Sequence, residues 1–319
     1  MKIASRLSLW LAVALLAGAY PSCGSRSGSG DLIMFGTIGA SPFQDHVYTV
    51  RSDGSQLRPF LKPEGQRSYT FASGNSLRAD LVVTVREMNA AGKVEPRLYL
   101  FRPEAHEWKR LPTIEGLVGR AHMSPDGSSV VFVFSPERRR NTTRFWIMNL
   151  KTGEMKKLTS DDQEDAWDGY PAWRPDGQEI MFIRLRPSGS VTITNLMSVP
   201  VAGGEPVSLI GPDESVSVVS YSPDGKRLAM LTGKGLEVMN ISDQGRTLLV
   251  PWERLPDLEF HAGGLTWSPR EDKIAFPLYN TRTKENELWT VSSNGEGAQA
   301  IIKLSADDGK ILVSTFLEP

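Results

Sequence analysis

The sequence is poor in residues that cross-link a chain or bind metals. It holds one cysteine, Cys23, among 319 residues. A single thiol cannot form an intramolecular disulfide, and a cysteine-based zinc site needs at least two thiolates. No two of the four histidines have metal-ligand spacing: His46, His106, His122 and His261. We therefore expect no bound metal and no other cofactor.

The sequence also lacks an excess of charge of either sign. Lys plus Arg total 36 and Asp plus Glu total 37, which gives a formal net charge of −1. A nucleic-acid-binding surface must neutralise phosphates with basic side chains, so a nucleic-acid partner is not expected. Hydrophobic residues make up 40% and charged residues 23%, the composition of a folded globular protein.

Only one long apolar run is present, at residues 7–19, directly after the basic residues Lys2 and Arg6. It is shorter than the roughly 20 residues that a permanent membrane-spanning helix needs, and its order is typical of a secretory signal peptide. Cys23 and a glycine- and serine-rich stretch follow. We expect a signal peptide at residues 1–22, a flexible tether at 23–30 and one folded domain at 31–319.

Two routes of processing fit this N-terminal segment. The cysteine after the apolar run resembles the lipidation site of a bacterial lipoprotein, in which Cys23 would become the lipid-anchored N-terminus. The alternative is ordinary signal cleavage after Ala19, which would leave no anchor. Both predict an exported protein on the periplasmic side of a bacterial membrane. The lipoprotein interpretation adds a membrane anchor, on the inner or the outer membrane.

A turn motif recurs through the chain. In each of four copies an aromatic residue or Met is followed by Ser or Arg and then by Pro, and in three of them Asp-Gly comes next. The Ser or Arg lies at positions 124, 174, 222 and 268, so successive copies are 50, 48 and 46 residues apart. Proline presets φ for a turn, Asp bonds back to the backbone, and Gly takes a positive φ. We therefore assign a structural role to Asp126, Gly127, Asp176, Gly177, Asp224 and Gly225.

Each turn is followed by three apolar segments, as in a four-stranded antiparallel β-propeller blade. Two further units precede position 124, and the first lacks its innermost strand. Residues 305–315 repeat the turn and strand at the end of the chain, so we expect them to complete the first blade and close the ring. The prediction is an all-β, six-bladed propeller; seven incomplete blades remain an alternative.

The repeated Ser-Pro-Asp-Gly turns and the stretch at residues 196–206 resemble the TolB-type β-propeller family. The resemblance covers about residues 31–319 and implies a propeller fold. Such propellers include cell-envelope adaptors and the gating domains of some serine peptidases. TolB itself carries an α/β domain before its propeller, whereas here only the short tether precedes the first expected blade.

Several polar side chains fall just before the turn motifs, near the expected central channel. They are Arg120, His122, Asp168, Tyr170 and His261. One interpretation is a polar binding pocket at the channel mouth. The other is that these residues only line a wet channel, as polar residues on inner strands do in any propeller.

The tryptophans divide into two groups. Trp146, Trp173, Trp267 and Trp289 occupy repeat positions, which predicts core packing between blades. Trp108, Trp167 and Trp252 fall in or near loops and are candidates for an exposed contact surface, because interfaces are rich in tryptophan.

The function favoured by these patterns is a non-catalytic protein-binding or scaffold module that captures an envelope protein or peptide. Spacing of the Gly-x-Ser-x-Gly type occurs only around residues 24–28, in the tether, so no serine-peptidase nucleophile is expected. A hydrolase or lyase acting at the central channel is one alternative. A sensor that binds a small ligand or ion there is another.

Overall fold

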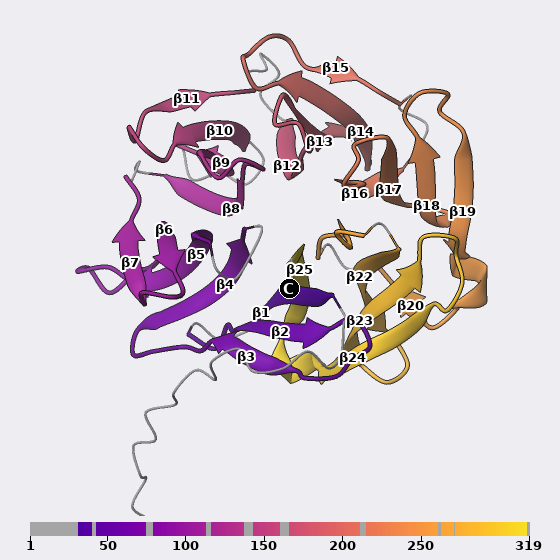
Figure 1. Cartoon of the computed structure of the whole chain (residues 1–319), viewed down its shortest axis with the longest axis horizontal. Helices are drawn as coiled ribbons and strands as arrows, with labels where there is room; N and C mark the ends of the chain where they lie inside the picture. Colours follow the sequence, from indigo (N-terminus) through magenta and orange to yellow (C-terminus); the bar gives the residue numbers. More distant parts are fainter. Residues whose placement is uncertain are drawn as a thin grey trace, which may run out of the picture.

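The computed structural model describes residues 31–39, 43–74, 79–112, 116–136, 143–159, 166–210, 215–260, 263–270 and 272–317. Within these ranges six antiparallel sheets are arranged around a central axis (Figure 1). Two 3₁₀ turns, η2 (Trp252–Arg254) and η3 (Ala306–Asp308), are the helical elements there. None of the helical segments in the described ranges has the length and apolarity to span a bilayer. The predicted all-β, six-bladed propeller is confirmed, whereas Cys23 and the expected signal peptide and tether lie outside the described residues.

Each blade has an inner strand beside the axis and an outer strand at the rim. Blade 1 contains β25 (Lys310–Leu317), β1 (Leu32–Ile38), β2 (Val47–Arg51) and β3 (Arg58–Leu61). Blade 2 contains β4 (Arg67–Ser73), β5 (Leu81–Met88), β6 (Val94–Arg102) and β7 (Glu107–Arg110). Blade 3 contains β8 (Leu117–Met123), β9 (Ser129–Ser135), β10 (Arg144–Asn149) and β11 (Met155–Lys157).

The second half of the chain forms the other three blades. Blade 4 contains β12 (Trp167–Trp173), β13 (Glu179–Ser188), β14 (Val191–Pro200) and β15 (Val207–Ser208). Blade 5 contains β16 (Val216–Tyr221), β17 (Arg227–Thr232), β18 (Gly235–Asn240) and β19 (Arg246–Pro251). In blade 6 the inner position is shared by β20 (Leu258–Glu259) and β21 (Thr266–Trp267), beside β22 (Lys273–Asn280), β23 (Glu285–Ser292) and β24 (Gln299–Ser305).

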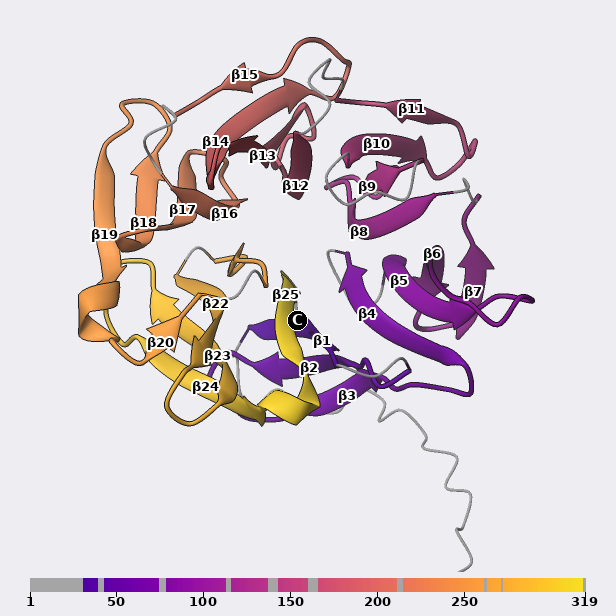
Figure 2. The same cartoon turned by 180° about the vertical axis from the view of Figure 1, so that it is seen from behind.

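The two ends of the described chain meet in blade 1. Strand β25 pairs antiparallel with β1, from Leu32 opposite Leu317 to Ile38 opposite Lys310. Seen from behind, β25 lies beside β1 at the inner edge of that blade (Figure 2). The predicted closure of the ring by the C-terminal strand is confirmed, and it pairs the backbone of β1, which would otherwise be an open strand edge.

The repeated turns have the predicted geometry. Gly127, Gly177 and Gly225 have φ of 70°, 71° and 69°, in the left-handed region that favours glycine. The carboxylate of Asp224 accepts hydrogen bonds from Ser222 Oγ at 2.6 Å and from the backbone N–H of Lys226 at 3.0 Å. Asp126 accepts equivalent bonds, and Asp176 accepts from the backbone N–H of residue 178. These bonds hold each aspartate within its own turn.

The hydrophobic core is divided among the contacts between blades. Six clusters of buried apolar side chains each join one blade to the next. Phe145 of blade 3, for example, packs edge-on against Phe182 of blade 4, with ring centroids 5.2 Å apart. Since alternate residues of a strand face opposite ways, both faces of each blade are buried. This explains why the strands read as continuous apolar runs.

The inner strands are bulged, which the sequence did not predict. In β8, Gly119 and Arg120 together oppose one residue of β9, and in β12, Tyr170 and Pro171 together oppose one residue of β13. Strands β4, β16 and β25 also carry register shifts. A bulge bends a strand and re-aims the side chains at that point. The bulges therefore decide which side chains enter the channel.

Ring closure predicts the effect of deleting β25. Removal of residues 310–319 should lower the free energy of unfolding by about 4 kcal/mol or more, because it exposes the apolar faces of blades 1 and 6 and the backbone of β1. Urea denaturation followed by circular dichroism measures this change. Lys310→Ala is the control, since that side chain is exposed and its loss should cost less than about 0.5 kcal/mol. Equal stability of the truncated and full chains would contradict the assignment.

Candidate functional site

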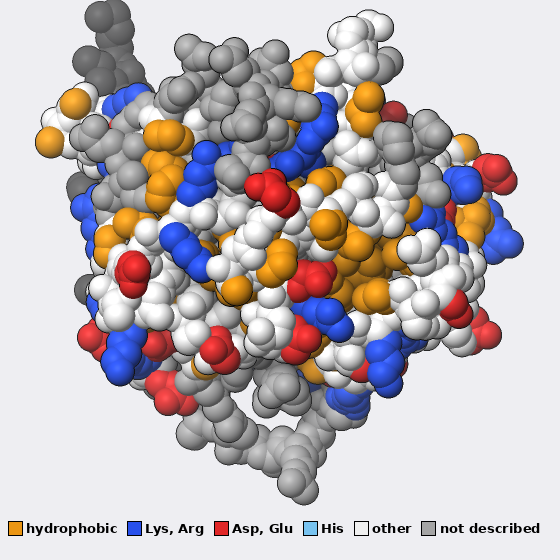
Figure 3. Space-filling model, turned by 90° about the horizontal axis from the view of Figure 1, so that it is seen from above, with side chains coloured by type: hydrophobic (Ala, Val, Ile, Leu, Met, Phe, Trp, Pro, Cys, Tyr) orange, Lys and Arg blue, Asp and Glu red, His pale blue; other side chains and the backbone are white. Residues whose placement is uncertain are grey.

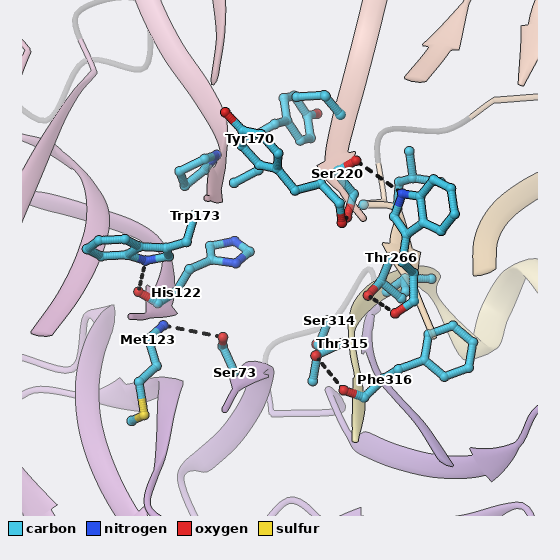
Figure 4. A pocket seen from close by; sticks show the side chains of 18 of the residues that line it. Ser73, His122, Met123, Tyr170, Trp173, Ser220, Thr266, Ser314, Thr315 and Phe316 are labelled. Atoms are coloured by element: carbon cyan, nitrogen blue, oxygen red, sulfur yellow. Dashed lines mark hydrogen bonds between the residues drawn. The ribbon is translucent and has the colours of Figure 1, made fainter. Parts of the chain in front are cut away.

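A cavity of about 400 Å³ lies on the axis of the propeller. Every blade contributes to its wall through an inner strand: β25, β4, β8, β12, β16 and β21. The side chains of Ser73, Tyr170, Thr266 and Thr315 lie around the central space, and the imidazole of His122 turns into it (Figure 4). The structure thus has a cavity in the region for which the sequence left two interpretations open, a polar binding pocket or only a wet channel lining.

The mouth of the cavity is built from the repeated turns. Their prolines, Pro125, Pro175, Pro223 and Pro269, are among its lining residues. The turn motif therefore has a second consequence beyond folding the blade: it places an uncharged, conformationally fixed residue at the rim in four of the six blades.

Two indoles hold neighbouring blades together beside the cavity. Trp173 Nε1 donates to the backbone carbonyl of His122 at 3.0 Å, and Trp267 Nε1 donates to the carbonyl of Ser220 at 3.2 Å. Each bond crosses from one blade to the preceding one. The predicted role of these tryptophans between blades agrees with this geometry, but both also line the cavity.

Arg120 is held between two aromatic rings. Its guanidinium carbon lies 5.8 Å from the ring centroid of Phe71 in blade 2 and 5.3 Å from that of Tyr170 in blade 4. Tyr170 has φ of 58°, a left-handed conformation that is uncommon for a residue with a bulky side chain. Burial lowers the pKa of the Arg120 guanidinium from its usual value. Both residues sit at the bulges of their strands, so the backbone has been distorted to bring them together.

His122 is half-buried, with one side toward the cavity and its ring centroid 4.9 Å from that of Phe71. Burial, and then the charge of Arg120, lowers the pKa of the imidazole from 6.5 to about 3. The ring is therefore neutral at physiological pH. Its nitrogens offer one donor and one acceptor to the cavity rather than a positive charge.

Of the two other predicted channel residues, Asp168 is not among the residues that line this wall. Asp168 is 1% exposed, and its carboxylate is paired with Arg184, whose Nε lies 2.7 Å from Oδ1. Thr159 Oγ1 donates to the other carboxylate oxygen at 2.6 Å. This buried network joins blade 3 to blade 4 and does not reach the cavity. His261 lies outside the described residues, so its predicted place at the channel stays a prediction.

The three tryptophans predicted as contact residues lie in different blades. Trp108 is half-buried on the outer strand β7 and stacks on Phe101, with centroids 4.2 Å apart. Trp167 is half-buried at the start of β12. Trp252 packs on the core between blades 5 and 6, and its Nε1 donates to the carbonyl of Thr232 at 2.9 Å. The structure does not gather these residues into one surface, and a contact role for any of them stays a prediction.

The sequence analysis did not single out several residues of the cavity wall. They include Met123, Tyr221, Ser314, Thr315 and Phe316. One signal was available: the residue that closes an inner strand directly before Ser-Pro or Arg-Pro repeats as Met123, Trp173, Tyr221 and Trp267, and all four line the cavity. Among the described side chains, no group of three or more His, Cys, Asp and Glu converges as a metal site requires.

The fold and its axial cavity define a six-bladed β-propeller with a pocket formed jointly by all of its blades. A family model described as the TolB beta propeller domain matches residues 90–313, well over half of the chain. The chain therefore belongs to this family, as the resemblance of its turns implied.

Individual proteins show the same architecture at low identity. TolB from Acinetobacter baumannii superposes with a TM-score of 0.65 at 18% identity, over 91% of this chain and 67% of that one. An oligogalacturonate lyase in complex with manganese gives a TM-score of 0.55 at 14% identity, over 87% of this chain and 75% of that one. At such identities the likeness shows the fold alone.

One curated relative is similar in sequence over a shorter stretch. The uncharacterized peptidase YuxL of Bacillus subtilis (strain 168) is 31% identical over 127 residues. The match covers 39% of this chain and 18% of the relative, so this chain spans less than a fifth of that protein.

The lowered pKa of His122 predicts that the stability of the fold depends on pH. The folded state keeps His122 neutral while the unfolded state binds a proton below about pH 6.5, so this contribution to stability is complete above pH 6.5 and is lost as the pH falls toward 3. Thermal melts at pH 7.5 and 5.0 should show a smaller decrease in His122→Gln than in the unaltered protein. His46→Gln, outside the cavity, should keep the full decrease. Identical decreases in all three proteins would contradict the prediction.

Proposed function

We propose that this propeller is a non-catalytic binding module of the bacterial cell envelope, which receives a peptide segment of a partner protein in its axial cavity. The observation that carries the proposal is the cavity itself, to which all six blades contribute and whose mouth carries turn prolines from four of them. The similarity to TolB, whose propeller resembles this one in architecture, supports an envelope role.

The cavity suits a peptide because its wall combines anchoring and orienting groups. Trp173, Trp267 and Phe316 offer aromatic surface, and burial of aromatic side chains at the centre of an interface contributes much of its energy. His122 and Thr266 offer hydrogen-bonding groups that fix orientation. The volume of about 400 Å³ falls in the range of roughly 300–1,000 Å³ that is usual for small-ligand pockets. A few residues of a partner therefore fit, while the rest of it contacts the rim.

The outer edge gives less support for a binding surface. On the edge seen in Figure 3, acidic and basic side chains are interspersed with hydrophobic ones, without a field of one sign. The near-neutral net charge of −1 agrees with this mixture. Neither the charge nor the pattern favours a strongly acidic or basic partner on that edge.

Anchoring through Cys23 is part of the proposal. A lipid-modified cysteine at the end of a short tether would hold the propeller at the membrane surface while leaving the cavity accessible, and more than one acyl chain is needed for stable attachment. Cys23→Ser should move the protein from the membrane pellet to the soluble fraction, or leave it unprocessed. Fractionation followed by intact-mass measurement distinguishes these results. Membrane retention of a correctly cleaved Cys23→Ser protein would contradict lipid anchoring.

Catalysis is the competing function, because enzymes share this architecture. The lyase superposes on this chain, and the local sequence match to YuxL involves a protein named as a peptidase. If the propeller were itself a hydrolase or lyase, turnover of an envelope polymer or peptide by the purified chain should depend on a cavity residue such as His122. We expect no such turnover.

Site-specific photocrosslinking tests the binding role. A benzoylphenylalanine at the exposed rim position Pro223 should crosslink to a discrete envelope protein in intact cells. The same probe at Val207, which is 55% exposed on the outer strand of blade 4, is the matched control and should not capture that protein. Capture from Val207 alone, or from neither position, would overturn the proposed cavity-mouth site.

A further inference from the structure

The two ends of the described chain leave the fold beside the mouth of the cavity. In blades 3 to 6 the turn motif joins the inner strand to the second strand. In blade 1 these two strands, β25 and β1, come from opposite ends of the chain, and Leu317 of β25 pairs with Leu32 of β1. Both chain ends therefore lie where other blades have their turns. We call this side of the ring, on which the cavity opens between the turn prolines, the turn face.

Contacts with neighbouring turns hold the first described residue, Asp31, at this place. Asp31 is 4% exposed, and its Oδ1 lies 3.1 Å from Nη2 of Arg270, the residue after the rim proline Pro269. The backbone carbonyl of Asp31 accepts a hydrogen bond from the N–H of Ser52 at 2.9 Å. The chain that leads back from Asp31 to Cys23 therefore starts from a fixed point beside the cavity mouth.

Covalent geometry limits how far this point can lie from a lipid on Cys23. Asp31 follows Cys23 by eight residues. A chain spans at most about 3.5 Å per residue, so the two residues are no more than about 28 Å apart. The limit holds for any path that the segment between them follows.

The opposite face of the ring, which carries the links between second and third strands, is beyond this reach. From β1 to the outer strand β3 there are two strand spacings, about 10 Å, and the seven residues of β1 give the blade a height of about 23 Å. A tether that placed the opposite face on the bilayer would have to run roughly 33 Å over the surface of blade 1, which exceeds about 28 Å. A lipid on Cys23 therefore turns the turn face toward the membrane.

The same limit decides what can enter the cavity from below. A compact domain of 100 residues has a radius of gyration of about 13 Å, which corresponds to a sphere about 34 Å across. Such a domain does not fit between a bilayer and a cavity mouth held within about 28 Å of it. A short segment of chain that rises from the membrane does fit.

We propose that the turn face is directed toward the membrane that holds the Cys23 anchor, and that the cavity receives the membrane-proximal segment of a membrane protein. This inference rests on the proposed function, including its lipid anchor. It adds the orientation of the propeller and the kind of partner.

Fluorescence quenching by lipids tests the orientation. Cys23 is the one cysteine of the chain and its thiol would carry the lipid, so an introduced cysteine can be labelled selectively. Lys226→Cys labels the turn face and Ser190→Cys labels the β13–β14 hairpin on the opposite face; both positions are exposed. Each purified, lipid-modified protein is added to phosphatidylethanolamine–phosphatidylglycerol vesicles that contain Ni²⁺-chelating lipids as short-range quenchers. We expect at least twofold stronger quenching at position 226.

Matched variants connect the difference to the tether. Gln178→Cys on the turn face and Ala91→Cys on the opposite face, both exposed, repeat the comparison in other blades. An insertion of about 24 Gly and Ser residues before Asp31 lengthens the reach about fourfold and should remove the difference. Equal quenching at the two faces, stronger quenching at the opposite face, or an undiminished difference with the long tether would overturn the inference.

The crosslink from Pro223 tests the kind of partner. Mass spectrometry of the crosslinked peptide should place it within roughly 10 residues of a membrane-spanning segment or a lipid anchor, since eight extended residues already cover about 28 Å. A crosslinked site in a domain remote from the membrane would overturn this partner, while the crosslink itself would still support peptide binding in the cavity. Stronger quenching at position 226 without any crosslink from Pro223 would support the orientation and overturn the cavity-mouth site.

Discussion

The pairing of β25 with β1 is the contact on which the rest of the ring depends. Each of the six apolar clusters is shared by two neighbouring blades, so no blade buries its own faces. A linear row of blades would leave two such faces exposed, and blade 1 would lack an inner strand. Strand β25 removes both problems because Val313 packs toward blade 6 and Leu317 toward blade 2. At the junction with blade 6, a Cβ on Gly264 would lie 2.4 Å from the carbonyl oxygen of Val313, so glycine permits the close approach.

Ring closure also brings the inner strands of all six blades together at the axis. Six inner strands converge there, and the bulges in five of them, with the interruption between β20 and β21, bend the backbone where space is smallest. Bulges place Arg120, Tyr170 and Ser314 at the channel against the regular alternation of their strands. Strand irregularity thus brings these three side chains to the channel, while the repeat supplies the prolines and the residues directly before them that also line the cavity.

The repeat made the architecture predictable, because few folds contain four copies of one turn at the spacing of a propeller blade. The additional strand at residues 310–317 could then be assigned to the first blade, which lacked an inner strand. The turn aspartates and glycines followed from the same local chemistry. The cavity was predictable only in part: Arg120, His122 and Tyr170 were found by their distance from the turns. Asp168 has the same kind of sequence position, but it is directed into the ion pair with Arg184, and no local pattern distinguishes the two directions. Trp108 and Trp252 likewise looked like loop residues, yet each packs on an apolar cluster reached only through tertiary contacts.

A cavity that belongs to all six blades ties binding to the integrity of the ring. A ligand that binds only the closed form stabilises it by RT ln(1 + [L]/Kd), which at a hundredfold excess over Kd is about 2.7 kcal/mol. Since β25 supplies Val313 to Phe316 to the wall while β8 supplies Arg120 from across the axis, the two halves of the site face each other only in the closed ring. The same strand pairing that stabilises the fold therefore assembles the site. A ligand touching both sides would act as a further contact between the first blade and the third, two blades that share no apolar cluster of their own.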